Sequence, residues 1–427
     1  MNKIKPILVV ADDFTGANDT VAQFAKLGLS CVTTLEIERV PELIAKYDVV
    51  AVDTESRAVD SKKAYDILYS LGVMIKELIA NEEIIIYKKV DSTLRGNITS
   101  EIKALYDSVL PDLVIFAPAY PKQDRTTING IHLVNGVPVD QTYFGRDPRA
   151  PVKSSYVPSY FEGFSESIYQ HVTLDSLRKR ELSKIILENN RRVLSFDIEN
   201  DDDFTLIFDS ILKLPHRRII WVGSAGLAEH LAYVLPTISK IKKPILIAVG
   251  SVNDVSRRQI STFINSHPDV SLILINITNL IENFTVEYNR IHEHVSSALD
   301  ENKDIILTTS YTPTQLEEGK LMATKLGLSM RDFGNVLADK FGELISSVIK
   351  DFGRESFGGI LLTGGDIAMA TIRHLGINCV EIKGEVEPGL PVLTSGDLYI
   401  VTKAGGFGKE GTLIRAVNVL KLLGGGE

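Results

Sequence analysis

The sequence predicts an α/β protein made of two α/β domains with mainly parallel sheets. Short apolar runs recur along the 427 residues, and most are followed by a polar or glycine-rich turn and then by an amphipathic stretch. This order of strand, turn and helix is typical of parallel sheets that are covered by helices. A chain of this length exceeds one ordinary core, so two or three domains are expected.

The first half of the chain repeats this order several times. Its strands are short runs of branched and aromatic apolar residues, and its helices space apolar residues three or four apart. Strands are predicted at Ile7–Ala11, Val49–Thr54 and Ile84–Ile86, within Leu113–Pro121 and 192–198, and at the start of Arg218–Leu235, with helices at Ser61–Ile79 and Ile98–Tyr106. Residues 123–136 predict a loop and a β-hairpin. The proline-rich residues 137–161 lack periodicity, and so long a loop in an enzyme is usually a lid or a substrate-binding element.

A polar, basic link with a proline at each end, Pro236–Pro244, separates the predicted domains at residues 1–236 and 244–427. Such links are typical domain boundaries. In the second half the strand ends carry glycine in place of carboxylates. Four strands are predicted, within residues 244–260, 305–315, 358–377 and 399–420, and all but the second clearly run on into an amphipathic helix.

The composition excludes several kinds of partner. The chain has 46 Lys and Arg against 55 Asp and Glu, a net charge of −9, which argues against a surface for nucleic acid or an anionic membrane. It has no apolar run long enough to span a membrane and no secretory signal, so a cytoplasmic protein is expected. Cys31 and Cys379 lie in apolar stretches and are expected to be reduced thiols in cores.

Two adjacent carboxylates, Asp12 and Asp13, follow the first predicted strand directly. Ligands of open α/β sheets bind beyond the carboxyl ends of the strands, and ionised groups are rarely buried without a partner. We therefore favour a functional role for both acids. The alternative is that Asp13 or Thr15 caps the following helix while Asp12 is simply solvated.

The end of the third predicted strand gathers a lysine, an acid, hydroxyls and an arginine, namely Lys89, Asp91, Ser92, Thr93 and Arg95. An arginine fork suits a carboxylate or a phosphate, and hydroxyls suit polyol oxygens. A structural ion pair between Asp91 and Arg95 is the alternative. Arg125 and Arg146 lie on loops, where binding residues concentrate, and are further candidates for anion contacts.

Glycine turns in the second half predict a phosphate site. They are Gly250–Ser251, Gly364–Gly365, and Gly405–Gly406 with Gly408. Such turns leave backbone N–H groups free at helix N-termini, and three of them at the ends of neighbouring strands favour a nucleotide pocket. None fits the P-loop or dinucleotide spacing, although residues 404–411 come nearest to the latter, with Lys403 and Lys409 beside them. The sequence shows no metal-ligand spacing and no covalent nucleophile motif.

A nucleotide-phosphate site in one half and an acid-and-arginine polyol site in the other predict phosphoryl transfer in an active-site cleft between the two domains. Such chemistry consists mainly of positioning and charge neutralisation, with Mg²⁺ bridging the phosphates and a carboxylate receiving the hydroxyl proton.

Seven motifs resemble those of the four-carbon acid sugar kinases, also called DUF1537 proteins, over nearly the whole chain. They are ADDFTGAND at 11–19, KKVDSTLRGN at 88–97, APAYP at 117–121, GSAGLA at 223–228, VGSVNDVSRRQ at 249–259, LLTGGDIA at 361–368 and KAGGFG at 403–408. The resemblance implies an N-terminal acid-sugar-binding domain, a C-terminal ATP-binding domain, and phosphorylation of a tetronate at its terminal hydroxyl.

The resemblance also implies roles for particular residues. The residues expected to contact ATP are Ser251, Gly364, Gly365, Asp366, Ile367, Gly405 and Gly408, and those expected at the sugar acid are Asp12, Asp13, Lys89, Asp91, Ser92, Arg95 and Arg125. Arg95, with Arg125 or Lys89, would neutralise the substrate carboxylate. Asp12 or Asp91 would act as the base, with Asp12 preferred. One departure from the family pattern is Gln123–Asp124, where a smaller residue such as Gly is expected before Arg125.

We therefore predict a Mg²⁺-assisted, ATP-dependent kinase of the C4 hydroxyl of a four-carbon sugar acid. Asn18–Asp19 in the first motif looks more like the D-threonate and D-erythronate kinases than the 3-oxo-tetronate kinases, and L-threonate is a further alternative. The expected partners are the sugar acid and ATP, with a homodimer as the candidate assembly and no protein-borne metal site. One alternative from another class is an NAD-dependent oxidoreductase, which should have an acid about 20 residues past the glycines of residues 404–411 to bind ribose, where this sequence has a Gly-rich run and Glu427. The other is a non-catalytic sugar-acid sensor.

Overall fold

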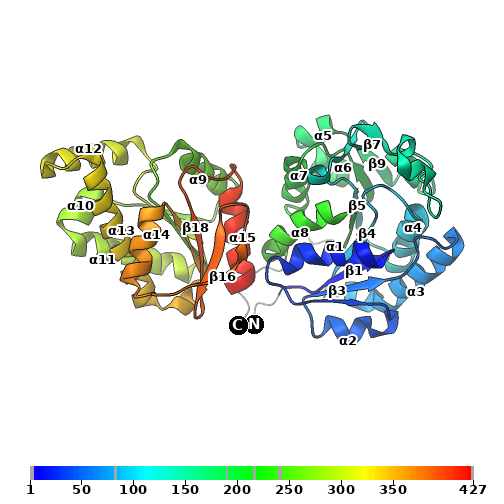
Figure 1. The fold of residues 1–427 in the computed structure, drawn as a ribbon, viewed down its shortest axis with the longest axis horizontal. Coiled ribbons are helices and arrows are strands. Elements are labelled where there is room, and N and C mark those ends of the chain that lie inside the picture. The colour runs from blue at the N-terminus through cyan, green and yellow to red at the C-terminus, as the bar shows by residue number, and fades with distance from the viewer. Residues whose placement is uncertain (1–3, 81–83, 189–190, 215–217, 239–242, 425–427) are drawn as a thin grey trace. The chain divides into compact units, whose positions relative to one another are not determined.

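The computed structural model describes residues 4–80, 84–188, 191–214, 218–238 and 243–424. The chain divides into two compact units, an N-terminal unit of residues 5–238 and a C-terminal unit of residues 239–427 with residues 1–4. Each unit is an α/β domain with a mainly parallel sheet, so the predicted fold class is confirmed (Figure 1). The predicted link Pro236–Pro244 lies partly outside the described residues. The predicted cleft between the domains stays a prediction.

The N-terminal unit is built on an eight-stranded parallel sheet with the order β2-β3-β1-β4-β11-β5-β10-β9. The strands are β1 (Ile7–Ala11), β2 (Cys31–Thr34), β3 (Val49–Asp53), β4 (Ile85–Lys89), β5 (Leu113–Ala117), β9 (Tyr169–Val172), β10 (Val193–Phe196) and β11 (Ile219–Gly223). The six central strands coincide with predicted ones. The two edge strands, β2 and β9, were not predicted, because they are short and only partly buried.

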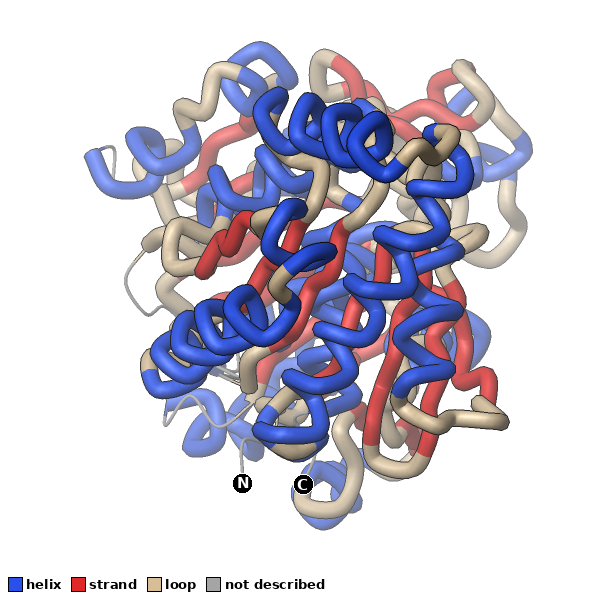
Figure 2. The backbone as a smooth tube through the Cα atoms, turned by 90° about the vertical axis from the view of Figure 1, so that its left-hand side faces the viewer, coloured by secondary structure: helices blue, strands red, loops and turns tan. Residues whose placement is uncertain are grey.

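Helices cover both faces of this sheet. They are α1 (Phe14–Ala25), α2 (Val40–Ile44), α3 (Ser61–Ala80), α4 (Ile98–Val109), α5 (Leu174–Arg178), α6 (Leu182–Glu188), α7 (Asp201–Ile211) and α8 (Ala225–Ile238). Figure 2 shows helices in front of the strands of the other, C-terminal unit as well. Successive residues of a strand face opposite sides of a sheet. Leu8, Val10 and Ile86 therefore join one core, together with Leu68 of α3 and Ile102 of α4.

The predicted β-hairpin is present as β6 (Arg125–Ile128) and β7 (Ile131–Val134), which β8 (Val137–Pro138) extends to a small antiparallel sheet. The predicted lid segment, residues 137–161, folds into three 3₁₀ turns, η3 (Val139–Gln141), η4 (Tyr143–Arg146) and η5 (Val157–Phe161). Val139, Val157 and Phe161 are buried. The segment is therefore anchored to the N-terminal unit by its own apolar side chains.

The C-terminal unit has a seven-stranded sheet with the order β13-β14-β12-β15-β18-β17-β16. The parallel strands are β12 (Ile245–Val249), β13 (Ser271–Leu274), β14 (Ile305–Thr308), β15 (Gly359–Thr363) and β18 (Leu398–Lys403), and β16 (Glu381–Glu385) and β17 (Pro391–Ser395) add an antiparallel edge. The helices are α9 (Asp254–Ser266), α10 (Ile277–Glu282), α11 (Phe284–Asp300), α12 (Pro313–Leu326), α13 (Met330–Phe352), α14 (Gly365–His374) and α15 (Thr412–Gly424).

The second of the four predicted strands, β14, also runs on into a helix. The side chain of Thr312 accepts a hydrogen bond from the backbone of Gln315, whose side chain in turn caps the backbone N–H of Thr312, and Pro313 stands at the first helical position. A capping box with proline at the first helical position is a sequence pattern that predicts the start of a helix, here α12.

Both sheets have a switch point beside their first strand. In the N-terminal unit β1 lies between β3 and β4, and in the C-terminal unit β12 lies between β14 and β15. In each case the chain first builds the sheet to one side of this strand and then crosses to the other side. Ligands of open α/β sheets bind beyond the strand ends at such a point.

Two expectations about the surface have clear outcomes. Cys31 is partly buried but Cys379 is exposed, so the prediction that both thiols lie in cores is wrong for Cys379. No helix in the described part of the chain is long and apolar enough to cross a membrane.

Candidate active site

The β1–α1 turn places its two carboxylates differently. Asp13 is the N-cap of α1, and its side chain accepts a hydrogen bond from the backbone N–H of Gly16 at 3.1 Å, so the capping alternative is confirmed for this residue. Asp12 is only 2% exposed. The alternative that Asp12 is solvated is therefore wrong, and its charge requires a partner.

That partner is Arg57, which the sequence reasoning missed. Arg57 donates from Nε to Oδ2 of Asp12 at 2.7 Å, and from Nη2 to Oδ1 of Asp12 at 3.0 Å and to Oδ1 of Asp13 at 2.7 Å. Burial opposes the charge of Arg57, but the bonds to Asp12 outweigh it and raise the pKa of the guanidinium. Because β3 lies beside β1, the turn after β3 brings Arg57 to the acids.

The β4–α4 turn contains a second arginine cluster. Nε of Arg95 donates to Oδ2 of Asp91 at 2.6 Å, and Nη1 donates to Oδ2 of Asp147 at 3.1 Å. The alternative of an ion pair between Asp91 and Arg95 is therefore confirmed. Burial would raise the pKa of Asp91, but the hydrogen bond from Arg95 and the charge of Arg57 outweigh it and lower the pKa to about 2. Asp91 is thus a weak proton acceptor.

Lys89, the last residue of β4, differs from both arginines. Its side chain is buried, with 4% of the residue exposed, and its Nζ makes no hydrogen bond or ion pair with any of the described residues. Burial lowers the pKa of Lys89, although Asp12 and Asp91 oppose this shift. A buried ammonium group without a bonded partner costs free energy. An anionic ligand bound beside Lys89 would reduce this cost.

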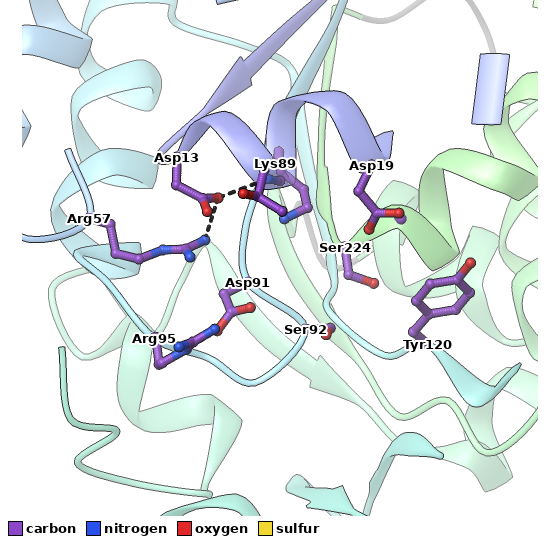
Figure 3. A pocket seen from close by; sticks show the side chains of 12 residues that line it. Asp13, Asp19, Arg57, Lys89, Asp91, Ser92, Arg95, Tyr120 and Ser224 are labelled. Carbon is purple, nitrogen blue, oxygen red and sulfur yellow. Dashed lines mark hydrogen bonds and ion pairs between the residues drawn. The ribbon is translucent and has the colours of Figure 1, made fainter. Parts of the chain in front are cut away.

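These side chains surround a pocket of about 280 Å³ within the N-terminal unit (Figure 3). Its lining residues are Asp13, Thr15, Gly16, Asp19, Arg57, Lys89, Asp91, Ser92, Arg95, Tyr120, Ser224 and Ala225. Of the predicted sugar-acid residues, Asp13, Lys89, Asp91, Ser92 and Arg95 line it. In the close view Arg57 and Arg95 lie on one side, and Asp19 and Tyr120 lie on the other.

Asp12 and Arg125 do not line this pocket. Asp12 lies behind it, bonded to Arg57. Arg125 is partly buried on β6, and its Nη1 donates to the backbone oxygen of Gln123. Asp124, the residue that departs from the family pattern, is exposed and takes up the left-handed conformation with φ of 55°. The loop therefore points its polar groups elsewhere than into the pocket.

Asp19 is the last residue of the motif ADDFTGAND, but no binding or catalytic role is predicted for it from the sequence. It is exposed on α1, one turn beyond Thr15, and no side chain among the described residues bonds its carboxylate. The sequence could have pointed to Asp19, because it lies four residues beyond Thr15 and residues three and four apart on a helix share one face.

Ser92 is fixed from behind by a buried histidine. Nε2 of His132 lies 2.8 Å from the backbone oxygen of Ser92, and Nδ1 lies 2.9 Å from Oγ1 of Thr127. Burial lowers the pKa of His132 to about 4, so the ring is neutral. A neutral ring that donates from Nε2 to the carbonyl must accept from the threonine hydroxyl at Nδ1. The β6–β7 hairpin thereby positions a residue of the pocket wall.

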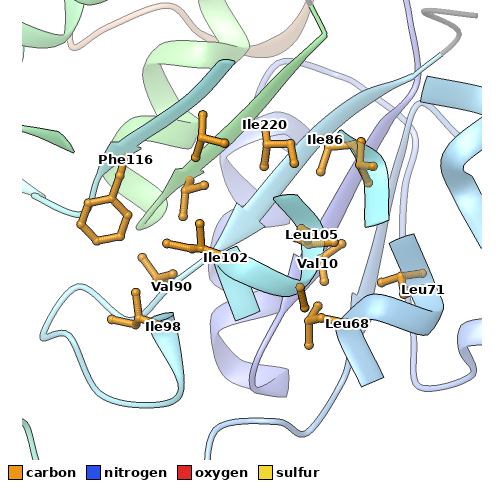
Figure 4. Packing of buried hydrophobic residues seen from close by; sticks show 14 of the residues in the cluster. Val10, Leu68, Leu71, Ile86, Val90, Ile98, Ile102, Leu105, Phe116 and Ile220 are labelled. Carbon is orange, nitrogen blue, oxygen red and sulfur yellow. The ribbon is translucent and has the colours of Figure 1, made fainter. Parts of the chain in front are cut away.

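On the opposite face of β4, Lys88 has a structural role. Nζ of Lys88 pairs with Oε2 of Glu101 at 2.8 Å, and both side chains are essentially inaccessible to solvent. Oγ of Ser56 donates to Glu101 at 2.5 Å, which ties the residue before Arg57 to this pair. The network lies on the face that packs against α3 and α4, beside Ile86 and Ile102 (Figure 4).

In the C-terminal unit the three glycine turns follow neighbouring strands, β12, β15 and β18. Gly405 approaches Ser251 so closely that a Cβ at position 405 would lie 2.0 Å from Oγ of Ser251, and a Cβ at Gly250 would lie 1.7 Å from Cδ1 of Ile367. Gly365 and Asp366 are exposed in the first turn of α14. The predicted nucleotide residues thus lie beyond the carboxyl ends of these strands, in the turns (Ser251, Gly364 and Gly405) or in the first turn of α14 (Gly365, Asp366 and Ile367).

Two buried polar groups mark the same edge. Lys403, 2% exposed, donates from Nζ to the backbone oxygens of Ala404 at 2.9 Å and Gly405 at 3.1 Å, and burial lowers its pKa to about 8. Oγ1 of Thr363, at the end of β15, is buried and has no hydrogen-bond partner among the residues that the structure describes. Buried hydroxyls normally have a partner, so an oxygen of a bound ligand would satisfy it. Lys409 is exposed.

Both domains match known family models. Residues 7–231 match a sugar-binding N-terminal domain, and residues 246–413 match a nucleotide-binding C-terminal domain. Together with relatives that are named D-threonate and D-erythronate kinases, these two domains define the class: the protein is a phosphotransferase that acts on a sugar acid. The chain belongs to the four-carbon acid sugar kinase family.

Similar proteins span nearly the whole chain. The D-threonate kinase of Salmonella typhimurium is 31% identical over 420 residues, covering 96% of this chain and 97% of that protein. The D-erythronate kinase of Heliobacterium modesticaldum is 27% identical over 430 residues, covering 97% of both. A crystal structure from Bordetella bronchiseptica, a domain-swapped dimer with bound citrate, superimposes with a TM-score of 0.70 at 26% identity and covers 97% of this chain and 98% of that one. These matches lend no support to an NAD-dependent oxidoreductase or a non-catalytic sensor.

Proposed function

We propose that the protein is an ATP-dependent kinase that phosphorylates the terminal (C4) hydroxyl of D-threonate or D-erythronate. Four relatives named D-threonate or D-erythronate kinases are 27% to 31% identical to this chain, whereas four named 3-oxo-tetronate kinases are 21% to 23% identical. This difference supports the preference drawn from Asn18–Asp19. A 3-oxo-tetronate and L-threonate remain the alternative substrates.

The free charge of Lys89 is the observation that carries the proposal for the N-terminal pocket. Arg57 and Arg95 each hold two carboxylates, so neither is available as the first anchor of a substrate carboxylate. Lys89 has no such partner among the described residues. We therefore assign the substrate carboxylate to Lys89 in place of Arg95 or Arg125. The hydroxyls of Ser92, Ser224 and Tyr120 line the same pocket and suit the polyol oxygens.

Asp19 suits the role of proton acceptor better than either predicted base. Both oxygens of Asp12 accept from Arg57 and the residue is outside the pocket lining, and Asp91 has a pKa of about 2. Asp19 lines the pocket, and its carboxylate has no bonded partner among the described residues. A base must lie within hydrogen-bonding reach of the hydroxyl that it deprotonates. We propose that Asp19 receives the C4 hydroxyl proton while that oxygen attacks phosphorus.

The C-terminal turns fit the phosphates of ATP. Gly365 is exposed at the first position of α14, Thr363 has a buried hydroxyl without a partner among the described residues, and Lys403 supplies a nearby charge. The described residues hold no group of three or more His, Cys, Asp or Glu side chains suited to a metal ion. Mg²⁺ is usually held by one or two carboxylates together with substrate phosphates, and Asp366 fits such a role. When bound, Mg²⁺ would neutralise phosphate charge.

Turnover of a substrate panel tests this function. ATP consumption is measured with D-threonate, D-erythronate, L-threonate and 3-oxo-tetronates, and ³¹P NMR locates the phosphate on the product. We expect turnover with a D-tetronate and a phosphomonoester at C4. A preference for a 3-oxo-tetronate would correct the substrate, and an absence of turnover with all of them would refute the proposal.

We also propose a homodimer, because the Bordetella bronchiseptica relative is described as a dimer. Light scattering coupled to gel filtration should give twice the 47.1 kDa mass of one chain. A monomeric mass at micromolar concentration would refute this assembly.

A further inference from the structure

Arg95 is held from three directions. Nε donates to Oδ2 of Asp91 at 2.6 Å, and Nη1 donates to Oδ2 of Asp147 at 3.1 Å. The guanidinium also lies over the ring of Phe144, 5.2 Å from the ring centre. Phe144 and Asp147 belong to residues 137–161, the segment that the sequence predicts as a lid or a substrate-binding element. This segment therefore reaches the pocket through a carboxylate.

Asp147 is held in place independently of Arg95. Its Oδ1 accepts hydrogen bonds from the backbone N–H groups of Arg149 and Ala150, both at 3.0 Å. These bonds lower the pKa of Asp147, so the group stays charged. An exposed ion pair between two flexible side chains contributes little, but here the orientation of the carboxylate is fixed by its own backbone turn. Asp147 is outside the pocket lining, but it is fixed where it binds Arg95, which lines the pocket.

The charges around the pocket are unevenly matched. Arg57 bonds Asp12 and Asp13, and Arg95 bonds Asp91 and Asp147. Lys89 is the cation of the pocket lining without a bonded carboxylate among the described residues, and Asp19 adds a further negative charge. The pocket therefore offers one positive charge to a ligand. A second anionic group would meet carboxylates and no available cation.

We propose that Asp147 is a specificity-determining residue that, by occupying Arg95, restricts the pocket to acids with a single carboxylate. The inference rests on the proposed function, because Lys89 then takes that carboxylate. A tartrate has the same carbon chain as a tetronate but carries a carboxylate at each end. Without the charge of Asp147, Nη1 of Arg95 becomes available to the second carboxylate.

Binding measurements on Asp147→Asn test this proposal. Asparagine keeps an oxygen for the turn at Arg149 and Ala150 but removes the charge. Isothermal titration calorimetry gives the Kd of the full-length protein for the tetronate that it phosphorylates and for a tartrate of the same C2 and C3 configuration. We expect the ratio of tartrate to tetronate affinity to rise tenfold or more in Asp147→Asn.

Two variants serve as controls. Asp140→Asn removes a carboxylate from the same segment that bonds Ser155 and not Arg95, and Asp147→Glu keeps the charge, so the ratio should stay within twofold in both. Asp147→Ser provides a second uncharged variant should Asp147→Asn not fold.

The possible outcomes are distinct. An unchanged ratio in the uncharged variants overturns the proposal. An equal gain for both ligands also overturns it, because Asp147 would then merely compete with the substrate carboxylate for Arg95. A wild-type protein that neither binds nor phosphorylates any tetronate refutes the proposed function itself, which the wild-type measurement alone reveals.

Discussion

The two units have their candidate ligand sites at the same point of the sheet but build them from different groups. Beside β1 the N-terminal unit gathers charged side chains, with Arg57, Arg95 and Lys89 among several carboxylates. Beside β12 the C-terminal unit has glycines, whose backbone approaches other residues as closely as Gly405 approaches Ser251. Both sites lie where the strand order changes direction, so the fold determines their position and the turn residues determine their chemistry.

This difference matches the ligands that we assign to each site. A small acid with several hydroxyls offers few atoms, so it is recognised by directed side-chain charges and hydroxyls. Phosphates are recognised through backbone N–H groups at helix starts, which require that no side chain intervene. Removal of charge should therefore impair the first site, and addition of a Cβ should impair the second.

The largest effect is expected from Asp19→Asn. If Asp19 accepts the hydroxyl proton, its loss should lower kcat by a factor on the order of 10² to 10⁴, with a much smaller change in the KM for either substrate. Steady-state kinetics checks this, with Asp175→Asn, a surface carboxylate paired with Lys179, as the control. A kcat within threefold of wild type would remove Asp19 from the mechanism.

Lys89→Met should impair sugar-acid binding. Truncating one partner of a buried charge pair costs about 2–5 kcal/mol, so kcat/KM for the tetronate should fall on the order of 10² to 10³. The KM for ATP should stay within twofold. Lys26→Met changes a lysine at the end of α1 that bonds Gln23 and should leave the kinetics unchanged. An ordinary tetronate KM in Lys89→Met would contradict the assignment.

Gly405→Ala tests the other side of the comparison. The new Cβ would lie 2.0 Å from Oγ and 2.7 Å from Cβ of Ser251, so either this turn or Ser251 must shift. Overpacking of this kind costs about 1–3 kcal/mol, and we expect the KM for ATP to rise about tenfold with the tetronate KM unchanged. Gly334→Ala, in an exposed helical position with nothing within 4 Å of its Cβ, is the matched control. Equal changes in both KM values would indicate a general loss of structure.

The smallest expected effect is the contribution of Lys403 to the pH dependence of the free energy of unfolding. Burial lowers the pKa of Lys403 from 10.5 to about 8, so between these values the unfolded chain binds more protons than the folded one. The free energy of unfolding contributed by this group therefore rises with pH across that window. Urea unfolding at several pH values should show this rise in the wild type and lose it in Lys403→Met. A wild-type-minus-variant difference that stays flat or falls would show that Lys403 is not desolvated in the folded protein.

The fold was largely predictable because its strands are short, buried and apolar. The runs at β1, β3, β5 and β12 end abruptly in polar or glycine-bearing turns, which determine the strand ends. The edge strands β2 and β9 have weaker patterns, since they are only partly buried. The antiparallel β16 was missed because its sequence, EIKGE, contains little apolar surface.

The candidate site was predictable only where several charged and hydroxyl residues gather at one strand end. Asp13, Lys89, Asp91, Ser92 and Arg95 lie at the ends of β1 and β4 or in the turns after them, and they line the pocket. Arg57 lies four residues beyond β3, and its role depends on the strand order, which places β3 beside β1. Asp147 lies 52 positions from Arg95 in an aperiodic segment, and no local pattern links the two.

The adjacent lysines at the end of β4 impose a constraint on strand registration. Lys88 is the cation of a dry internal ion pair, and Lys89, on the reverse side, is our assigned anchor for the substrate. Since consecutive side chains alternate sides, sliding this strand by one position would exchange the two lysines and lose both functions together. A single-residue insertion or deletion between Ile85 and Lys89 should thus be tolerated less than either point substitution.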